Sequence, residues 1–340
     1  PRYARAFDLE HVGEATLLTV FRSSSGRTAA EAETGVASRY LLVERGAELP
    51  RSDPDATVIR TPVRSVVTLS STYLPALEEL GVSGHIVGHD RRSWVYSPEI
   101  RARMRRGEIE QVGSGGDLDL ELLLSLSPDV VFTYDAGTSA ENPYPRLAET
   151  GLTVVTTAEY LEHSPLGRSE WILFMAAFFD LEEAAREVFS RIEKRYLELK
   201  RRASETDERP TVFLNAPWGA SWAMPEGANY SAVFLEHAGA DYVFSERSGS
   251  GTLFLDFETV LAEAGDAEYW LNPGDWESLR EGLSRDRRFR LFRAFREEHV
   301  YNNNAGVAPD GGNDYFESGY LRAERVLADL IAIFHPELMP

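Results

Sequence analysis

Residues 117–134, DLDLELLLSLSPDVVFTY, decide the fold class of this chain. The leucines between residues 118 and 126 recur at helical spacing, and Asp117 or Asp119 is placed to cap the first turn. A Pro-Asp pair then ends the helix and introduces Val130–Phe132, an apolar β-branched run that predicts a strand. A short helix followed directly by an apolar strand is typical of a βαβ unit.

The same alternation continues on both sides of this stretch. Before it, strands over 63–69 and 85–88 flank a helix over 74–80 that ends at a glycine. After it, the pattern predicts a helix over 144–150 and a strand over 153–155. Strands that alternate with helices at this spacing form a mostly parallel sheet covered by helices.

A helical region separates this first α/β unit from a second one. Residues 171–178 carry one apolar face. Asp180 is placed as an N-cap, and a stripe from Ala185 to Leu199 predicts a helix that follows it to about Ala203, about 35 Å long. The pattern then restarts, with strands expected over 211–214, 269–271 and 300–301 and helices over 231–238, 256–264, 276–283 and 320–334. The predicted fold is α/β, with two lobes joined by one long helix, each lobe holding a mostly parallel sheet flanked by helices.

The first sixty residues alternate differently. Runs over 16–21 and 39–43 predict an antiparallel pair of strands added to the first lobe. We expect this extension to cover an edge strand rather than to bind a ligand. The expected domains are an N-terminal lobe over 1–165, in which 1–58 form the added β-hairpin extension, an inter-lobe helical region over 166–204, and a C-terminal lobe over 205–340.

Charge excludes some partners. The 340 residues include 55 acidic and 35 basic side chains, which give a net charge of −20. Such a chain repels nucleic acid and anionic lipid. Only Lys194 and Lys200 are lysines, which suits either a salt-adapted host or a genome rich in arginine codons. There is no cysteine, so disulfides and thiolate metal sites are excluded.

Signatures of catalysis and of metal binding are weak. No glycine is followed by lysine, so there is no P-loop, and Gly219–Ala223 lacks the second glycine of a nucleophile elbow. His85 and His89 are four residues apart, but His85 opens a predicted strand, where that spacing does not bring ligands together. We expect neither an enzyme nor a metal site. An enzyme on a related two-lobed scaffold and an adhesion protein are the competing classes.

Residues 110–113 (EQVG) and 119–131 (DLELLLSLSPDVV) resemble a signature of periplasmic binding proteins for iron-siderophores, haem and cobalamin. The resemblance extends to PVRSVV at 62–67, to the inter-lobe helix over 185–196 and to SAVFLEHAGA at 231–240. These elements follow the family's order. The chain therefore resembles the substrate-binding subunit of an ABC importer, in the class III group whose lobes are joined by a helix.

This resemblance implies a ligand held, without being altered, in the crevice between two rigid lobes. Open α/β sheets bind ligands at the carboxyl ends of their strands. The corresponding loops are 70–73, 91–94, 114–115, 134–135, 218–222, 272–276 and 302–304. The candidate ligand-binding residues are Tyr73, Arg91, Trp94, Tyr134, Arg168, Trp218, Trp222 and Trp276. For each Trp and Tyr, packing inside a lobe is the alternative interpretation.

The resemblance also implies a docking charge on each lobe. In the family, one Glu per lobe meets arginines of the permease subunits, and the matching positions here are Glu121 and Glu236. Both lie on predicted helices whose apolar neighbours would face inward, which leaves the carboxylates able to face outward. The implied partners are an ABC permease and its ATPase, with the protein itself a monomer.

The identity of the ligand is less constrained. Haem-binding relatives carry a Tyr after the "VG" motif, where this chain has Ser114. Arg91, Arg92 and Arg168 suit an anionic siderophore, whereas an aromatic crevice suits cobalamin and hydroxamate siderophores equally. The predicted cargo is a ferric siderophore, with a corrinoid as the alternative and no covalently bound cofactor. The resemblance implies a periplasmic protein or an extracytoplasmic lipoprotein whose signal segment is absent from this sequence; a trimmed cytoplasmic protein is the alternative.

Overall fold

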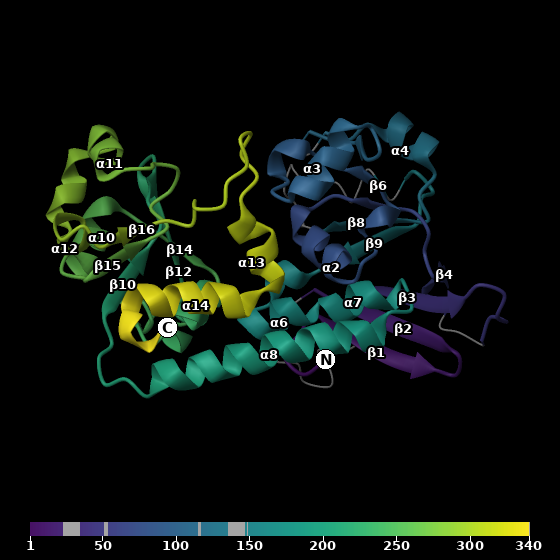
Figure 1. Cartoon of the computed structure of the whole chain (residues 1–340), viewed down its shortest axis with the longest axis horizontal. Coiled ribbons are helices and arrows are strands. Elements are labelled where there is room, and N and C mark those ends of the chain that lie inside the picture. Colours follow the sequence, from purple (N-terminus) through teal and green to yellow (C-terminus); the bar gives the residue numbers. More distant parts are fainter. Residues whose placement is uncertain (23–34, 51–53, 115–116, 135–146, 148, 340) are drawn as a thin grey trace. The chain divides into compact units, whose positions relative to one another are not determined.

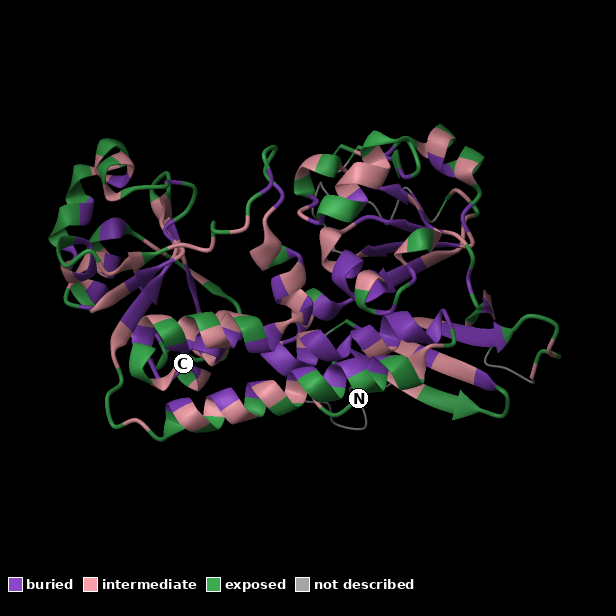
Figure 2. Cartoon of the chain, in the orientation of Figure 1, coloured by how far each residue is buried: buried purple, intermediate pink, exposed green. Residues whose placement is uncertain are grey.

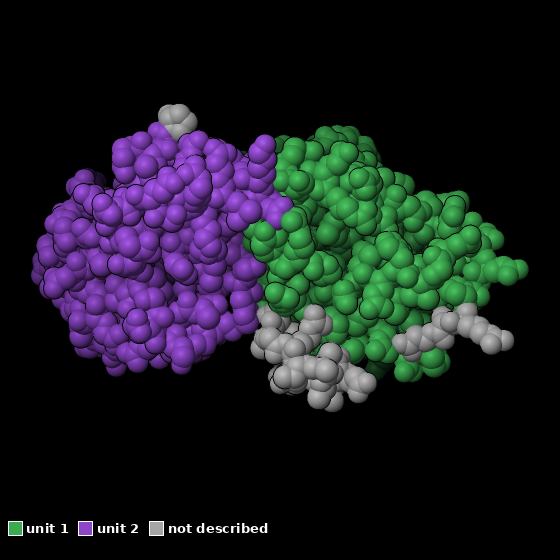
Figure 3. Space-filling model, turned by 90° about the horizontal axis from the view of Figure 1, so that it is seen from below, with its two compact units in different colours: residues 1–162, 166–191, 307–321 green, residues 163–165, 192–306, 322–340 purple. Residues whose placement is uncertain are grey.

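The computed structural model describes residues 1–22, 35–50, 54–114, 117–134, 147 and 149–339. The chain divides into two compact units (Figure 3). The first comprises residues 1–162, 166–191 and 307–321, and the second comprises 163–165, 192–306 and 322–340. Each unit contains a parallel sheet flanked by helices, which confirms the predicted fold class.

The first unit is built on a five-stranded sheet in the order β7-β6-β5-β8-β9 (Figure 1). Its central strands are buried, which explains why they appear in the sequence as short apolar runs without polar alternation. All neighbouring strands are parallel. The strands are β5 (Val66–Thr68), β6 (Ile86–His89), β7 (Glu110–Gln111), β8 (Val130–Tyr134) and β9 (Val154–Thr157).

Short helices connect these strands. Asp119 caps α4, because its carboxylate accepts a hydrogen bond of 2.9 Å from the backbone N–H of Leu122. Leu123 then packs with Val67 and Val131 in the core. The helix predicted over 144–150 lies mostly outside the described residues. The helices are η1 (Ser71–Tyr73), α2 (Leu74–Glu79), η2 (Ser83–His85), η3 (Arg92–Trp94), α3 (Pro98–Arg105), α4 (Leu120–Leu126) and η4 (Glu159–Leu161).

The first unit has a second sheet, in the order β1-β2-β3-β4, whose strands come before those of the five-stranded sheet along the chain. The predicted antiparallel pair is present as β2 (Ala15–Phe21) and β3 (Val36–Glu44). The sequence did not predict β1 (Phe7–Val12), antiparallel to β2, or β4 (Thr57–Thr61), parallel to β3. The Tyr40 hydroxyl on β3 accepts a 2.7 Å hydrogen bond from the backbone N–H of Thr156. This contact covers part of the outer edge of β9.

Two buried carboxylates hold the first residues of the chain. Glu170 accepts hydrogen bonds from the backbone N–H groups of Arg2, Tyr3 and Ala4 at 2.7, 2.7 and 2.8 Å. Glu162 accepts from the backbone of residues 5 and 6 in the same way. Both glutamates are 1% exposed. Residues 2–6 are therefore attached to the helical part of the first unit by charge-assisted hydrogen bonds.

The helical region contains α6 (Pro165–Glu170), α7 (Ile172–Ala177) and α8 (Glu182–Ser204). The 23 residues of α8 alternate between buried and exposed faces along its length (Figure 2). The predicted apolar stripe is buried throughout: Ala185, Val188, Ile192, Tyr196 and Leu199. Residues up to 191 belong to the first unit and those from 192 to the second, so α8 is the long helix that the sequence predicts.

The second unit has a four-stranded parallel sheet in the order β13-β10-β15-β16. Its strands are β10 (Thr211–Leu214), β13 (Asp241–Tyr242), β15 (Tyr269–Leu271) and β16 (Val300–Tyr301). Its helices are α9 (Tyr230–His237), α10 (Phe257–Ala264), α11 (Leu279–Arg285), η5 (Arg287–Leu291), α12 (Arg293–Arg296), α14 (Ala323–Phe334) and η7 (Pro336–Leu338). Helix α11 begins three residues later than predicted, because Ser278 is its N-cap.

A small antiparallel sheet of the second unit was not predicted. It contains β11 (Pro217–Trp218), β12 (Ser221–Pro225) and β14 (Thr252–Leu255), in that order. The strands are too short for a clear alternation in the sequence.

The segment 307–321 packs with the first unit. It contains η6 (Asp314–Phe316) and α13 (Ser318–Leu321), and α14 starts only after Arg322, so the single helix predicted over 320–334 is interrupted. Glu317 accepts hydrogen bonds from the backbone N–H groups of Tyr96 and Ser97 at 2.7 and 2.8 Å. The domain boundaries expected at residues 165 and 204 remain a prediction. The segment 307–321 lies inside the range expected for the C-terminal lobe, 205–340, but packs with the first unit. Among the described residues, none of the helices combines the length and apolar character needed to cross a bilayer.

Candidate functional site

The carboxyl ends of β5, β6, β8 and β9 lie at one edge of the five-stranded sheet, because these strands are parallel. Tyr73, Arg91 and Trp94 lie in the segments that leave this edge, and Tyr134 is the last residue of β8. Four of the residues predicted to bind ligand are therefore gathered at one edge. Asp135 and Gly115, on two of the predicted loops, lie outside the described residues.

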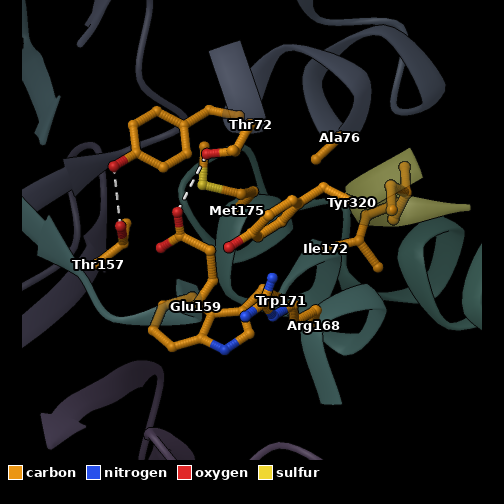
Figure 4. A pocket seen from close by; sticks show the side chains of 11 residues that line it. Thr72, Ala76, Thr157, Glu159, Arg168, Trp171, Ile172, Met175 and Tyr320 are labelled. Atoms are coloured by element: carbon orange, nitrogen blue, oxygen red, sulfur yellow. Dashed lines mark hydrogen bonds between the residues drawn. The ribbon is translucent and has the colours of Figure 1, made fainter. Parts of the chain in front are cut away.

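A pocket of the first unit lies beside the ends of β8 and β9 (Figure 4). Its volume is ≈ 30 Å³, which is room for about one or two water molecules and far too little for a whole chelate. Its walls come from η1, α2, β9, η4, α6, α7 and α13. The lining residues are Thr72, Tyr73, Ala76, Thr157, Glu159, Arg168, Trp171, Ile172, Met175, Tyr320 and Leu321.

Glu159 provides a buried carboxylate in this pocket. The residue is 6% exposed, and burial raises the pKa of its carboxyl group. Its Oε1 accepts a hydrogen bond of 3.0 Å from the Thr72 hydroxyl. Its Oε2 is buried and has no hydrogen-bond partner among the described residues. A buried carboxylate oxygen without a donor is rare, because water would otherwise solvate it.

Two predicted residues, Tyr73 and Arg168, line the same pocket. The Tyr73 hydroxyl lies 2.9 Å from Oγ1 of Thr157, and burial raises the pKa of this phenol well above its ordinary value. The Arg168 guanidinium lies 4.7 Å from the centre of the Tyr320 ring and donates hydrogen bonds to the backbone carbonyls of Tyr160 and Glu162, each at 3.2 Å. Arg168 thus forms one wall of the pocket.

Arg91 and Trp94 form a second pair at the same edge. The Arg91 guanidinium stacks on Trp94, 3.9 Å from the ring centre, and Trp94 is 41% exposed. The Nε of Arg91 lies 3.9 Å from the Asp90 carboxylate, which is too far for a hydrogen bond. Its Nε is buried and has no hydrogen-bond partner among the described residues. This arginine therefore retains an unused donor.

Arg92 is held differently. Its Nε donates to the Asp310 carboxylate at 3.4 Å, and Arg101 bonds to the same carboxylate. Arg92 is therefore already paired with an acidic residue.

The second unit places its three predicted tryptophans very differently. Trp218 on β11 is 91% exposed, whereas Trp222 and Trp276 are 0% and 4% exposed. Trp222 donates to the Leu214 carbonyl at 3.0 Å and packs on Phe213, 6.0 Å between ring centres. Trp222 and Trp276 therefore occupy the core of this unit, as the packing alternative expects.

The face of Trp218 also carries an aromatic residue that the sequence did not single out. Trp218 pairs with Ser221, and Phe254 pairs with Ala223, two residues further along the same strand β12. Residues two apart on a strand share a face. Phe254, 75% exposed, thus shares the outer face of this sheet with Trp218.

The two predicted docking carboxylates are both at the surface. Glu121 is exposed in the first turn of α4, and Glu236 is exposed near the end of α9. Their apolar neighbours Leu123 and Leu235 are buried. The outward orientation that docking requires is present in each unit, while docking itself remains a prediction.

Glu159 and Tyr320 were missed in the sequence. Glu159 follows β9 by two residues, so extending the strand-end rule to residue 159 would have found it. Tyr320 had no such signal, because it lies far along the chain in a segment expected to belong to the other lobe. Among the described residues, no cluster of three or more His, Asp or Glu side chains could hold a metal ion.

Two α/β units, one long helix and a strand-end edge with arginine and aromatic side chains define a class of solute-binding proteins. The chain belongs to the periplasmic binding protein family, whose model matches residues 66–305. It is therefore a solute-binding protein of the kind that serves ABC importers. The family consists of substrate-binding proteins rather than enzymes.

Individual relatives and solved structures are also similar to this chain. An uncharacterized lipoprotein of Methanocaldococcus jannaschii is 28% identical over 290 residues, which cover 82% of this chain and 67% of the relative. A solved periplasmic binding protein from Veillonella parvula has a TM-score of 0.65 at 13% identity and covers 97% of this chain and 98% of its own.

Two further solved structures are of proteins named for a ligand. An ABC-type Fe3+-hydroxamate transport system from Saccharomonospora viridis has a TM-score of 0.59 at 17% identity, covering 81% of this chain and 94% of its own. The vitamin B12 binding protein of Vibrio cholerae has a TM-score of 0.56 at 12% identity, covering 80% and 97%. At these identities the likeness shows the fold.

Proposed function

We propose that this protein captures a ferric siderophore outside the cytoplasm and delivers it to the permease of an ABC importer. Family membership and the similarity of fold to an Fe3+-hydroxamate transport protein support this proposal. A corrinoid is the alternative cargo, since a vitamin B12 binding protein has the same fold.

The observation that carries the choice of a ferric siderophore is the state of Arg91. Its guanidinium is stacked on the exposed Trp94, and its buried Nε has no hydrogen-bond partner among the described residues. Guanidinium groups bind the carboxylate and catecholate oxygens of anionic chelates through charge-assisted hydrogen bonds. An acceptor supplied by the cargo would satisfy this donor.

The remaining contacts with the cargo would be largely aromatic. Trp94 and Tyr134 at the strand-end edge of the first unit, and Trp218 in the second unit, offer apolar area at little cost in side-chain entropy. Arg168 lines the pocket beside them. We leave Tyr73, Trp222 and Trp276 out of the proposed contact set, because each of them is buried.

Delivery would depend on Glu121 and Glu236. Each is an exposed carboxylate on a helix, one in each unit, and each is available to pair with permease arginines. Attachment of the protein to the membrane by a lipid is part of the proposal and is supported by the relative named as a lipoprotein.

The direct test is the absorption spectrum and native mass of the protein purified from its own host. A ferric charge-transfer band with a matching mass would support the proposal, whereas a corrinoid spectrum would establish the alternative cargo. Titration with a panel of ferric siderophores and corrinoids, followed by tryptophan fluorescence, gives affinities. The absence of bound cargo together with silence across both panels would refute transport of a chelate.

A further inference from the structure

The pocket around Glu159 is too small for a chelate, yet it contains a buried carboxylate with an unused acceptor. We propose that it is a binding site for a primary ammonium group, –NH3+, carried on an arm of the cargo. Naming the cargo as a chelate rests on the proposed function, while the preference of the pocket for an ammonium group does not.

The hydrogen bonding of Glu159 defines the missing partner. Oε1 already accepts from the Thr72 hydroxyl at 3.0 Å, whereas Oε2 has no donor among the described residues. At 6% exposure, bulk water has little access to this carboxylate. Leaving a buried acceptor unpaired costs free energy, so a group that brings a donor is favoured at this position.

The pocket walls favour a donor that is also a cation. The rings of Tyr73, Trp171 and Tyr320 surround the carboxylate together with the thioether of Met175, and Figure 4 shows the hydroxyl end of Tyr320 directed toward Glu159. The ionised carboxylate of Glu159 attracts a cation, and its Oε2 can accept a hydrogen bond from an ammonium group. An anionic group would be repelled by the same carboxylate.

Size selects among cations. A volume of ≈ 30 Å³ accommodates one ammonium group and the carbon next to it. A quaternary ammonium would not fit. A bare Ca²⁺ or Mg²⁺ ion prefers several carboxylate ligands, whereas Glu159 is the single carboxylate among the described lining residues. The site therefore discriminates between –NH3+ and its larger or more strongly hydrated competitors.

The Arg168 guanidinium also lines the pocket. Its guanidinium lies over the Tyr320 ring and donates to the carbonyls of residues 160 and 162. Burial raises the pKa of Glu159, and Arg168 opposes that shift more weakly than the hydrogen bonds to the carboxyl group do. Oε2 thus still lacks a hydrogen-bond donor among the described residues, which an incoming ammonium group would provide.

The first experiment uses methylammonium chloride as the probe and compares it with tetramethylammonium chloride and potassium chloride at equal ionic strength. We expect methylammonium alone to raise the melting temperature of the wild-type protein in a saturable way. Glu159→Gln removes the charge but keeps the side-chain shape, and it should weaken methylammonium binding about tenfold or more. Glu187→Gln is the matched control, since Glu187 is exposed on α8.

Equal stabilisation by all three salts, or unchanged methylammonium binding in Glu159→Gln, would overturn the inference. Stabilisation by potassium alone would assign the site to a metal ion and would overturn it as well. If Glu159→Gln does not fold, the discrimination between the three salts by the wild-type protein still decides the question.

A second experiment links the pocket to the cargo. A ferric trihydroxamate with a terminal primary amine is compared with its N-acetylated form. We expect the amine to bind about tenfold more tightly in the wild-type protein and the two forms to bind equally in Glu159→Gln. Equal binding in the wild type would overturn the ammonium site and leave the proposed function intact. If neither the amine nor its N-acetylated form binds, the pocket does not take part in recognising the cargo. The panel of ferric siderophores and corrinoids tests the proposed function separately.

Discussion

The substitution Glu170→Ala tests how the first residues of the chain are held. Glu170 is 1% exposed and accepts three backbone hydrogen bonds, from residues 2, 3 and 4. The N–H of Ala4 is buried, whereas those of Arg2 and Tyr3 are partly buried and can regain water. Removing the carboxylate therefore leaves the buried N–H of Ala4 without an acceptor and exchanges the other two hydrogen bonds for bonds to water.

The magnitude follows from these contacts. A hydrogen bond to a charged group contributes about 1.5–3 kcal/mol, and rehydration returns part of it for the two outer donors, so we expect a loss of about 2–4 kcal/mol. For a unit of this size that loss lowers the melting temperature by roughly 4–16 °C.

Calorimetry and hydrogen exchange together measure this effect. We expect a lower transition temperature and faster exchange of the amides of residues 3–6 in Glu170→Ala. The control is Glu187→Ala, an exposed glutamate of α8, which should change stability by no more than about 0.5 kcal/mol. If Glu170→Ala behaves like this control in both measurements, the hydrogen bonds do not stabilise the N-terminal segment and the reasoning fails.

Three further predictions concern the site and the segment 307–321. Arg91→Gln should weaken binding of an anionic ferric chelate about tenfold. The control Arg105→Gln, which replaces an exposed arginine of α3, should leave the affinity unchanged. Equal effects of the two substitutions would argue against a contact at Arg91. Glu121→Ala combined with Glu236→Ala should reduce transport in reconstituted vesicles and preserve affinity, whereas lost affinity would show that the docking faces are misplaced. Burial raises the pKa of Glu317 to about 7 in the folded protein. This carboxyl group therefore stabilises the fold fully only at a pH below its pKa in the unfolded chain. That contribution to stability is lost as the pH rises toward and through 7. Urea unfolding at pH 5 and at pH 7.5 measures this change. Between these two pH values, the free energy of unfolding should fall by about 2–3 kcal/mol more in the wild type than in Glu317→Gln. An equal fall in the two proteins would contradict this.

The sequence indicated which residues would lie near one edge of the first sheet, while their role in binding a ligand stays a prediction. Tyr73 and Arg168 line one pocket, and Arg91 stacks on Trp94 at the same sheet edge. The reason is topological, because parallel strands bring their carboxyl ends to one edge of the sheet. The loops that follow such strands therefore lie near one another, independently of the rest of the fold.

The tryptophans of the second unit show where that reasoning stops. Trp218 and Trp222 lie in one short loop-and-strand segment, yet one is 91% exposed and the other 0%. Trp222 and Met224 alternate inward on β12, whereas Trp218 lies on the outer face. A two-residue strand such as β11 shows no periodicity, so the sequence could not tell a surface aromatic residue from a core one.

The sequence by itself determined what depends on neighbours along the chain. The cap at Asp119, the apolar stripe of α8 and the alternation of strands and helices each require only a few nearby residues. Tertiary structure decided the pocket, in which Glu159 meets Tyr320 from a segment far away in sequence. That meeting results from packing of residues 307–321 on the first unit, through contacts such as those of Glu317. Long-range packing depends on the complementarity of whole surfaces, which no local pattern in the sequence records.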